Sequence, residues 1–133
     1  VALACLQLDT LELTFAGAER SLLLLRDEQV QEIQTSRHII GGNFEQQQKH
    51  FFSKKLQLQA QDRLYMFTDG YTDQFGGSPK KRKLSTRKFK DLILQIHQMP
   101  MEHQKIALQQ HIQDWQNGYA QIDDMLVIGL HIC

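Results

Sequence analysis

Two short stretches decide the fold, RLYMFTDG at residues 63–70 and DDMLVIGL at residues 123–130. The first is apolar on both faces up to Thr68, which is typical of an interior strand in a sheet that is covered on both sides. It stops at Asp69-Gly70, a common turn signal. The second places an apolar run directly after a pair of aspartates, so residues 125–130 predict a last buried strand.

Further short strands are predicted before and between these stretches. An apolar run predicts a central strand, and alternation of apolar with polar residues predicts a half-buried strand. The strands predicted in this way lie at residues 1–8, 11–15, 22–25, 30–33 and 54–59. Because short polar links join three of these strands, we expect an antiparallel meander from residue 11 to residue 33. A Gly-Gly pair and three consecutive glutamines predict a loop over residues 35–53.

Two helices are expected late in the chain. Ser85 or Thr86 can cap a first helix, whose apolar residues recur at positions i, i+3, i+4 and i+7, namely Phe89, Leu92, Ile93 and Ile96. Pro100 ends this helix, and a second stripe consists of Leu108, Ile112 and Trp115, the last expected to pack helix against sheet. The pattern as a whole predicts an α+β fold with a mostly antiparallel sheet.

Composition excludes several classes of protein. The 133 residues suffice for one domain, and 15 basic residues balance 15 acidic ones, so nothing attracts the chain as a whole to nucleic acid or to an anionic membrane. No apolar run approaches the roughly 20 residues that span a bilayer. Two cysteines at opposite ends form no disulfide framework, which favours a reducing, cytoplasmic location.

Acidic residues flank the two decisive strands. Asp69 follows the first strand, and Asp123 and Asp124 precede the second, so antiparallel pairing would bring these carboxylates to one end of the sheet. A hard divalent cation, Mg²⁺ or Mn²⁺, is the natural partner of such a cluster, and Gly70 lets the chain turn tightly beside it. From spacing alone, an ordinary Asp-Gly turn and a solvated Asp-Asp pair explain the pattern better.

Other polar residues offer weaker candidates. Six histidines show no paired metal-binding spacing. The basic run Lys80-Lys81-Arg82-Lys83 follows Gly-Gly-Ser-Pro and predicts a solvated loop. A nucleic-acid patch is the alternative, but the net charge is zero and no aromatic residue interleaves the run.

Three stretches follow one another along the chain: FAGAERSLLLLRDEQVQEI (15–33), FTDGYTDQFGG (67–77) and DDMLVIGL (123–130). In that order they resemble the metal-dependent (PPM, type 2C) protein phosphatases, and more closely their bacterial SpoIIE-like branch. The resemblance implies an α-β-β-α sandwich with a two-metal centre between the sheets. It also implies a phosphoserine or phosphothreonine protein as substrate, often a small anti-sigma-factor antagonist.

Carried over residue by residue, the resemblance makes Asp69, with Gly70 beside it, the metal-binding Asp of the "DG" motif. Asp123 matches the metal-binding Asp of the last motif, with Asp124 the less favoured ligand of that pair. Asp73 matches an acidic position near an auxiliary metal. The basic run at residues 80–83 falls in a variable segment beside the active site and would attract a phosphorylated partner by its charge.

One motif of the resembling phosphatases is missing. No D-x-x-G-H occurs in the 133 residues; in those phosphatases its Asp bridges the two metals. Residues 1–133 therefore resemble the C-terminal part of one phosphatase domain, whose parent has room for a sensor or membrane domain upstream. Alone, the chain should hold Mg²⁺ poorly and be weakly active or inactive.

Two further expectations concern partners. Strand edges without neighbours predict a homodimer. The alternative to an enzyme is a non-catalytic interaction domain that binds a regulator through the basic run and the helices, and the sequence upstream of Val1 would discriminate between the two.

Overall fold

The computed structural model describes residues 1–41 and 50–133. Its strands are β1 (Ala2–Gln7), β2 (Glu12–Gly17), β3 (Leu22–Arg26), β4 (Gln29–Ile33), β5 (Ser53–Gln57), β6 (Arg63–Phe67), β7 (Phe75–Gly76), β8 (Arg82–Lys83) and β9 (Val127–His131). Its helices are α1 (Asp69–Asp73), α2 (Thr86–Ile96) and α3 (Met101–Gln116). None of these helices is both long enough and apolar enough to cross a membrane.

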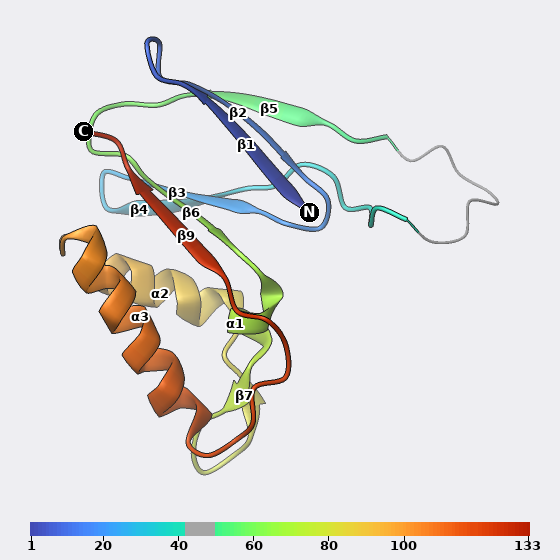
Figure 1. The fold of residues 1–133 in the computed structure, drawn as a ribbon, viewed down its shortest axis with the longest axis vertical. Coiled ribbons are helices and arrows are strands. Elements are labelled where there is room, and N and C mark those ends of the chain that lie inside the picture. The colour runs from blue at the N-terminus through green and yellow to red at the C-terminus, as the bar shows by residue number, and fades with distance from the viewer. Residues whose placement is uncertain (42–49) are drawn as a thin grey trace.

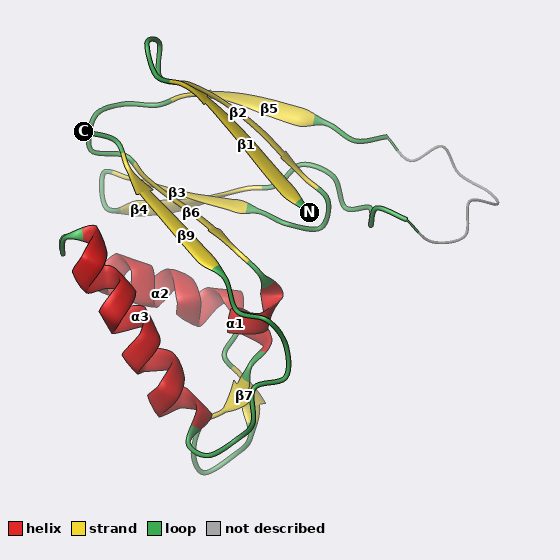
Figure 2. Ribbon diagram, viewed as in Figure 1, coloured by secondary structure: helices red, strands yellow, loops and turns green. Residues whose placement is uncertain are grey.

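The strands form two antiparallel sheets and one small hairpin. One sheet has the order β1-β2-β5, the other has the order β4-β3-β6-β9, and β7 pairs with β8. In Figure 1 the two sheets lie one above the other, and the helices lie below the four-stranded sheet. Figure 2 shows the same three layers as two layers of strands and one of helices.

Strand β3 lies at the centre because both of its faces are covered. Leu22 and Leu24 face the other sheet, where they join Leu13 and Phe15 of β2 in one apolar core. The alternate residues of β3 face the helices and join a second core with Tyr65 of β6. This two-sided burial explains why the strand is a continuous apolar run rather than an alternating one.

The helical layer is held to the sheet mainly by α2. The side chain of Ser85 caps this helix by accepting a hydrogen bond from the Lys88 main-chain N–H at 3.5 Å. All four residues of the predicted stripe are buried against the sheet: Phe89, Leu92, Ile93 and Ile96. In α3 only Gln104 and Leu108 are buried. Trp115 packs against the core that the helices share with the sheet, and also against the β7–β8 hairpin, where Gly76 and Gly77 leave room for it.

The fold class is confirmed, since the structure is α+β and mostly antiparallel and has three layers of the expected α-β-β-α sandwich. Two kinds of local prediction are wrong, the continuous meander and the burial of the first and last strands. The meander is split, because β2 pairs with β1 and β5 whereas β3 pairs with β4 and β6. The first and last strands are edge strands rather than buried ones, and Leu3, Ile128 and Leu130 are exposed. Part of the predicted 35–53 loop, residues 42–49, lies outside the described residues.

Candidate functional site

The two acidic segments meet because β6 and β9 are antiparallel neighbours. Phe67 is paired with Val127 at the end of the ladder. Beyond it, Thr68 prolongs the contact: its main-chain N–H donates to Leu126 O at 3.0 Å and its hydroxyl donates to Asp124 O at 2.8 Å. The same hydroxyl oxygen accepts from the Leu126 main-chain N–H at 2.9 Å. Asp69 and the Asp123-Asp124 pair therefore emerge at the same end of the sheet.

Gly70 makes a close approach possible between α1 and the second acidic segment. A Cβ at this position would lie 2.3 Å from Asp124 O and 3.2 Å from Asp123 O, so no larger residue fits without a shift of the backbone. The predicted Asp-Gly turn is in fact the start of the short helix α1. The glycine is required because the backbone of the 123–124 segment packs directly against the helix.

Gln74 anchors the loop that leads to Asp123, and sequence reasoning missed it. Its side chain is fully buried. Its amide N–H donates to Ala120 O at 2.9 Å, and its amide oxygen accepts from the Ile122 main-chain N–H at 3.4 Å. Glutamine is usually exposed, and no local sequence pattern marks Gln74 as buried, as it and Gln104 are in the structure.

The side chains of three of the four predicted acidic ligands have different partners in the structure. Asp69 pairs with Arg20, with 2.7 Å between Oδ2 and Nη2. Asp73 pairs with Lys83, with 2.7 Å between Oδ2 and Nζ. Asp123 accepts a hydrogen bond from the Asp124 main-chain N–H at 2.8 Å. Arg20 carried no signal in the sequence, because it lies in a polar link 49 residues away from Asp69.

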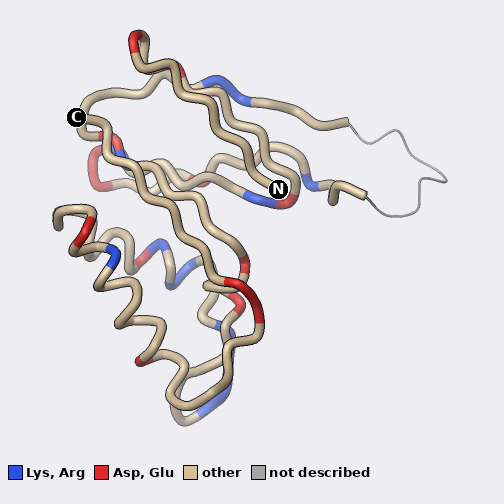
Figure 3. The backbone as a smooth tube through the Cα atoms, in the orientation of Figure 1, with Lys and Arg blue, Asp and Glu red and all other residues tan. Residues whose placement is uncertain are grey.

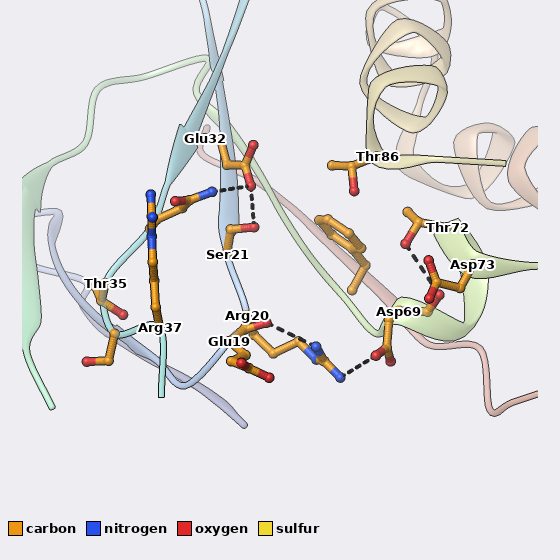
Figure 4. A pocket seen from close by; sticks show the side chains of 13 residues that line it. Glu19, Arg20, Ser21, Glu32, Thr35, Arg37, Asp69, Thr72, Asp73 and Thr86 are labelled. Atoms are coloured by element: carbon orange, nitrogen blue, oxygen red, sulfur yellow. Dashed lines mark hydrogen bonds and ion pairs between the residues drawn. The ribbon is translucent and has the colours of Figure 1, made fainter. Parts of the chain in front are cut away.

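A cleft of about 520 Å³ opens beside Asp69. Figure 4 shows that one wall comes from the ends of β3 and β4, with Arg20 and Glu32, and that the other wall comes from α1 and the start of α2, with Asp73 and Thr86. Burial by itself raises the pKa of Glu32, but hydrogen bonds from Lys90, Gln34 and Ser21 lower it to about 2. Asp123 and Asp124 lie outside the lining of this cleft.

The oxygen atoms at the β6–β9 end of the sheet are of the chemical type that binds a divalent cation. Carboxylate and main-chain oxygens are the ligands that Mg²⁺ and Mn²⁺ take. Within residues 1–41 and 50–133, no three His, Cys, Asp or Glu side chains come together in a group that could hold a metal ion. The described residues therefore bring the Asp69 and Asp123 segments to one end of the sheet without completing a metal-binding group by themselves.

The basic run is more ordered than a solvated loop. Its last two residues form β8, and Figure 3 shows its charges gathered at the end of the molecule below α1. Lys81 lies 4.7 Å from the ring centre of Phe75 and 5.2 Å from that of Tyr119, and Arg82 lies over Trp115 at 5.6 Å. The aromatic partners that the run lacks in sequence are thus supplied by other segments. Lys80 is exposed, and Lys83 reaches Asp73 at the cleft.

Comparison with known proteins agrees with this architecture. The SiaA-PP2C domain of Pseudomonas aeruginosa superimposes with a TM-score of 0.81 and 28% sequence identity, over 92% of this chain and 47% of that one. The phosphatase domain of the cell fate determinant SpoIIE from Bacillus subtilis superimposes with a TM-score of 0.71 and 19% identity, over 99% of this chain and 57% of that one. This chain thus spans about half the length of these structures.

Sequence comparison assigns the family. No curated protein matches the chain significantly. The sequence model of the family described as Stage II sporulation protein E matches residues 1–132. The chain therefore belongs to the SpoIIE family and has the fold of the PP2C-type phosphatases.

Proposed function

We propose that the protein is a metal-dependent serine/threonine protein phosphatase, to which this chain contributes Asp69 and Asp123 as ligands of a Mg²⁺ or Mn²⁺ centre. The observation that carries the proposal is the junction at the ends of β6 and β9, where Thr68 and Gly70 hold the two acidic segments together. A divalent cation bound there supplies an activated water and charge stabilisation for phosphate ester hydrolysis. A SpoIIE phosphatase-domain structure from Bacillus subtilis is described as presoaked in Mn, which agrees with this choice of metal.

The other residues of the site act by position. Thr68 ties the start of α1 to the 124–126 main chain, and Gln74 holds the loop that carries Asp123. Asp73 and Asp124 flank the two ligands and complete the acidic end of the sheet. Since the chain spans about half of the similar phosphatase structures, we expect it to be weakly active or inactive alone.

The substrate that we propose is a phosphorylated cytoplasmic protein of the anti-sigma-factor antagonist class. The exposed side chains of Lys80, Lys81 and Arg82 present positive charge beyond the cleft, and Lys83 links this surface to Asp73. Such a surface accelerates encounter with an anionic phosphoprotein, and the effect weakens with salt. A homodimer formed through exposed strand edges, that of the first strand β1 among them, stays a prediction.

The test is hydrolysis of a phosphoserine protein by the full-length protein with Mn²⁺. Asp69→Asn and Asp123→Asn should each lower kcat/KM by about 100-fold or more, because they remove a metal ligand. The matched control is Asp9→Asn in the exposed β1–β2 turn, which should leave the rate unchanged. Calorimetric titration with Mn²⁺ should show the same loss of binding in the first two variants alone.

Two outcomes would overturn the proposal. Parent-like turnover in the double variant Asp69→Asn with Asp123→Asn would remove both residues from the metal centre. A full-length protein that binds no Mn²⁺ and hydrolyses no phosphoprotein would favour the non-catalytic interaction domain.

A further inference from the structure

Arg20 is the cationic partner of Asp69 in the structure. It lies between β2 and β3, where Nη2 pairs with Asp69 Oδ2 at 2.7 Å and Nη1 donates to Glu19 O at 3.0 Å. Figure 4 shows its side chain extending across the cleft toward α1. About a third of the side chain is exposed, so the guanidinium is in contact with solvent and is not locked in a core.

The other paired acids of the cleft have cations of their own. Glu32 is bound by Lys90 of α2, and Asp73 is bound by Lys83 of β8. Neither of these contacts involves Arg20. If Asp69 were taken by another positive charge, the guanidinium would therefore lose its carboxylate partner while still extending into the cleft.

A divalent cation and Arg20 compete for the same carboxylate. Oδ2 of Asp69 is already a hydrogen-bond acceptor of the guanidinium, and two cations on one carboxylate repel each other. A cation that binds Asp69 must therefore displace Arg20 or be weakened by it. The displaced guanidinium offers a planar fork of donors, whose geometry matches the oxygens of a phosphoryl group.

Resting on the proposed function, we propose that Arg20 exchanges partners. Without a cation it neutralises Asp69, and with the cation in place it turns to the phosphoryl group of the substrate in the cleft. Arg37 lines the same cleft and has no ion-pair partner within the described ranges, so a second cationic donor is available on that wall. The site would then gain its anion-binding residue when the metal arrives.

The first arm of the test measures affinity for Mn²⁺ by calorimetry on the full-length protein. Arg20→Gln should bind Mn²⁺ about two- to fivefold more tightly than the unchanged protein, because an exposed ion pair no longer competes. The control is Arg87→Gln on α2, which makes the same change of net charge at an exposed residue without touching Asp69. It should leave the affinity for Mn²⁺ unchanged.

The second arm uses inorganic phosphate as the probe on the Mn²⁺-loaded protein. Arg20→Gln should weaken phosphate binding about tenfold or more, since it removes a charged hydrogen-bond donor. Arg20→Lys keeps the charge but lacks the fork, so its affinity for phosphate should be intermediate. Thermal melting of each variant in chelator checks that the fold is retained.

The outcomes separate this proposal from the proposed function. Unchanged affinity for phosphate in Arg20→Gln, or an equal loss in Arg87→Gln, overturns the exchange whatever happens to the metal. Weaker rather than tighter binding of Mn²⁺ in Arg20→Gln also overturns it. If Asp69→Asn itself leaves Mn²⁺ binding intact, the proposed function fails first.

Discussion

Glu32 shows how a single carboxylate joins the sheet to the helical layer. It lies on β4, and it accepts hydrogen bonds from Ser21, directly before β3, and from Lys90 of α2. These bonds outweigh burial and lower its pKa to about 2. Because folding lowers this pKa, the ionised form stabilises the protein above the ordinary value of 4.5, and the contribution is lost as the pH falls through about 2.

Glu32→Gln should therefore lower the free energy of unfolding at neutral pH by about 1–3 kcal/mol. The difference from the unchanged protein should shrink as the pH falls from 4.5 through about 2, because the carboxylate is protonated in both states only below that value. Urea unfolding at a series of pH values measures it. The exposed Glu28→Gln, in the β3–β4 turn, should show no such dependence, and a pH-independent loss in Glu32→Gln would contradict the account.

At the scale of elements, the candidate site depends on two segments whose backbones pack against each other. They are the start of helix α1 and the segment that leads into β9. The helix α1 contributes Asp69 and Asp73, and the segment before β9 contributes Asp123 and Asp124. Gly70 sets how close these two elements come, and the buried Gln74 holds the far end of the loop. Their separation is therefore controlled by residues that are not ligands themselves.

Gly70→Ala tests this control. The added methyl group would meet Asp124 O at 2.3 Å and push the 123–124 segment away from α1. We expect a loss of stability of about 1–3 kcal/mol from overpacking, together with weaker binding of Mn²⁺ in the full-length protein. Chemical denaturation and calorimetry measure the two effects.

Gly118→Asn is the matched control for Gly70→Ala. A Cβ at residue 118 meets nothing within 4 Å, and asparagine tolerates the positive φ of 87° at that position. This variant should be nearly neutral for both stability and metal binding. Unimpaired Mn²⁺ binding in Gly70→Ala would show that the close approach is not needed.

At the scale of the whole molecule, an ion pair helps to join the two sheets. Arg26 of β3 donates from Nε to Asp62 Oδ1 at 2.8 Å, and its Nη2 also donates to Gln57 O at the end of β5. Asp62, which is only 2% exposed, also accepts from the Gln59 main-chain N–H at 2.8 Å. The four-stranded sheet is thereby bound to the chain that leaves the three-stranded sheet.

Asp62→Asn should destabilise the protein by about 1–3 kcal/mol, because it weakens the charged hydrogen bonds that the buried carboxylate accepts from Arg26. Both apolar cores should loosen together, since β3 contributes to each of them. Thermal unfolding gives the loss of stability, and hydrogen exchange reports on the two sheets separately. Asp91→Asn, exposed on α2, is the control; loss of protection in one sheet alone would mean that the pair does not couple them.

The sequence by itself determined the elements whose burial follows from local spacing. The α2 stripe and the two-sided apolar run of β6 were predicted because side-chain direction repeats every 3.6 residues in a helix and every two in a strand. The meeting of the Asp69 and Asp123 segments was predicted only on the condition that the two strands are antiparallel neighbours, and the structure supplied that condition.

Only the tertiary structure decided which strands share a sheet and which polar side chains meet. It split β2 from β3, made β1 and β9 edge strands, buried Gln74 and brought Arg20 to Asp69 across 49 residues. These contacts depend on distant segments that supply the other partner. A local pattern indicates which residues of a segment share a face, and it carries no information on what lies opposite that face.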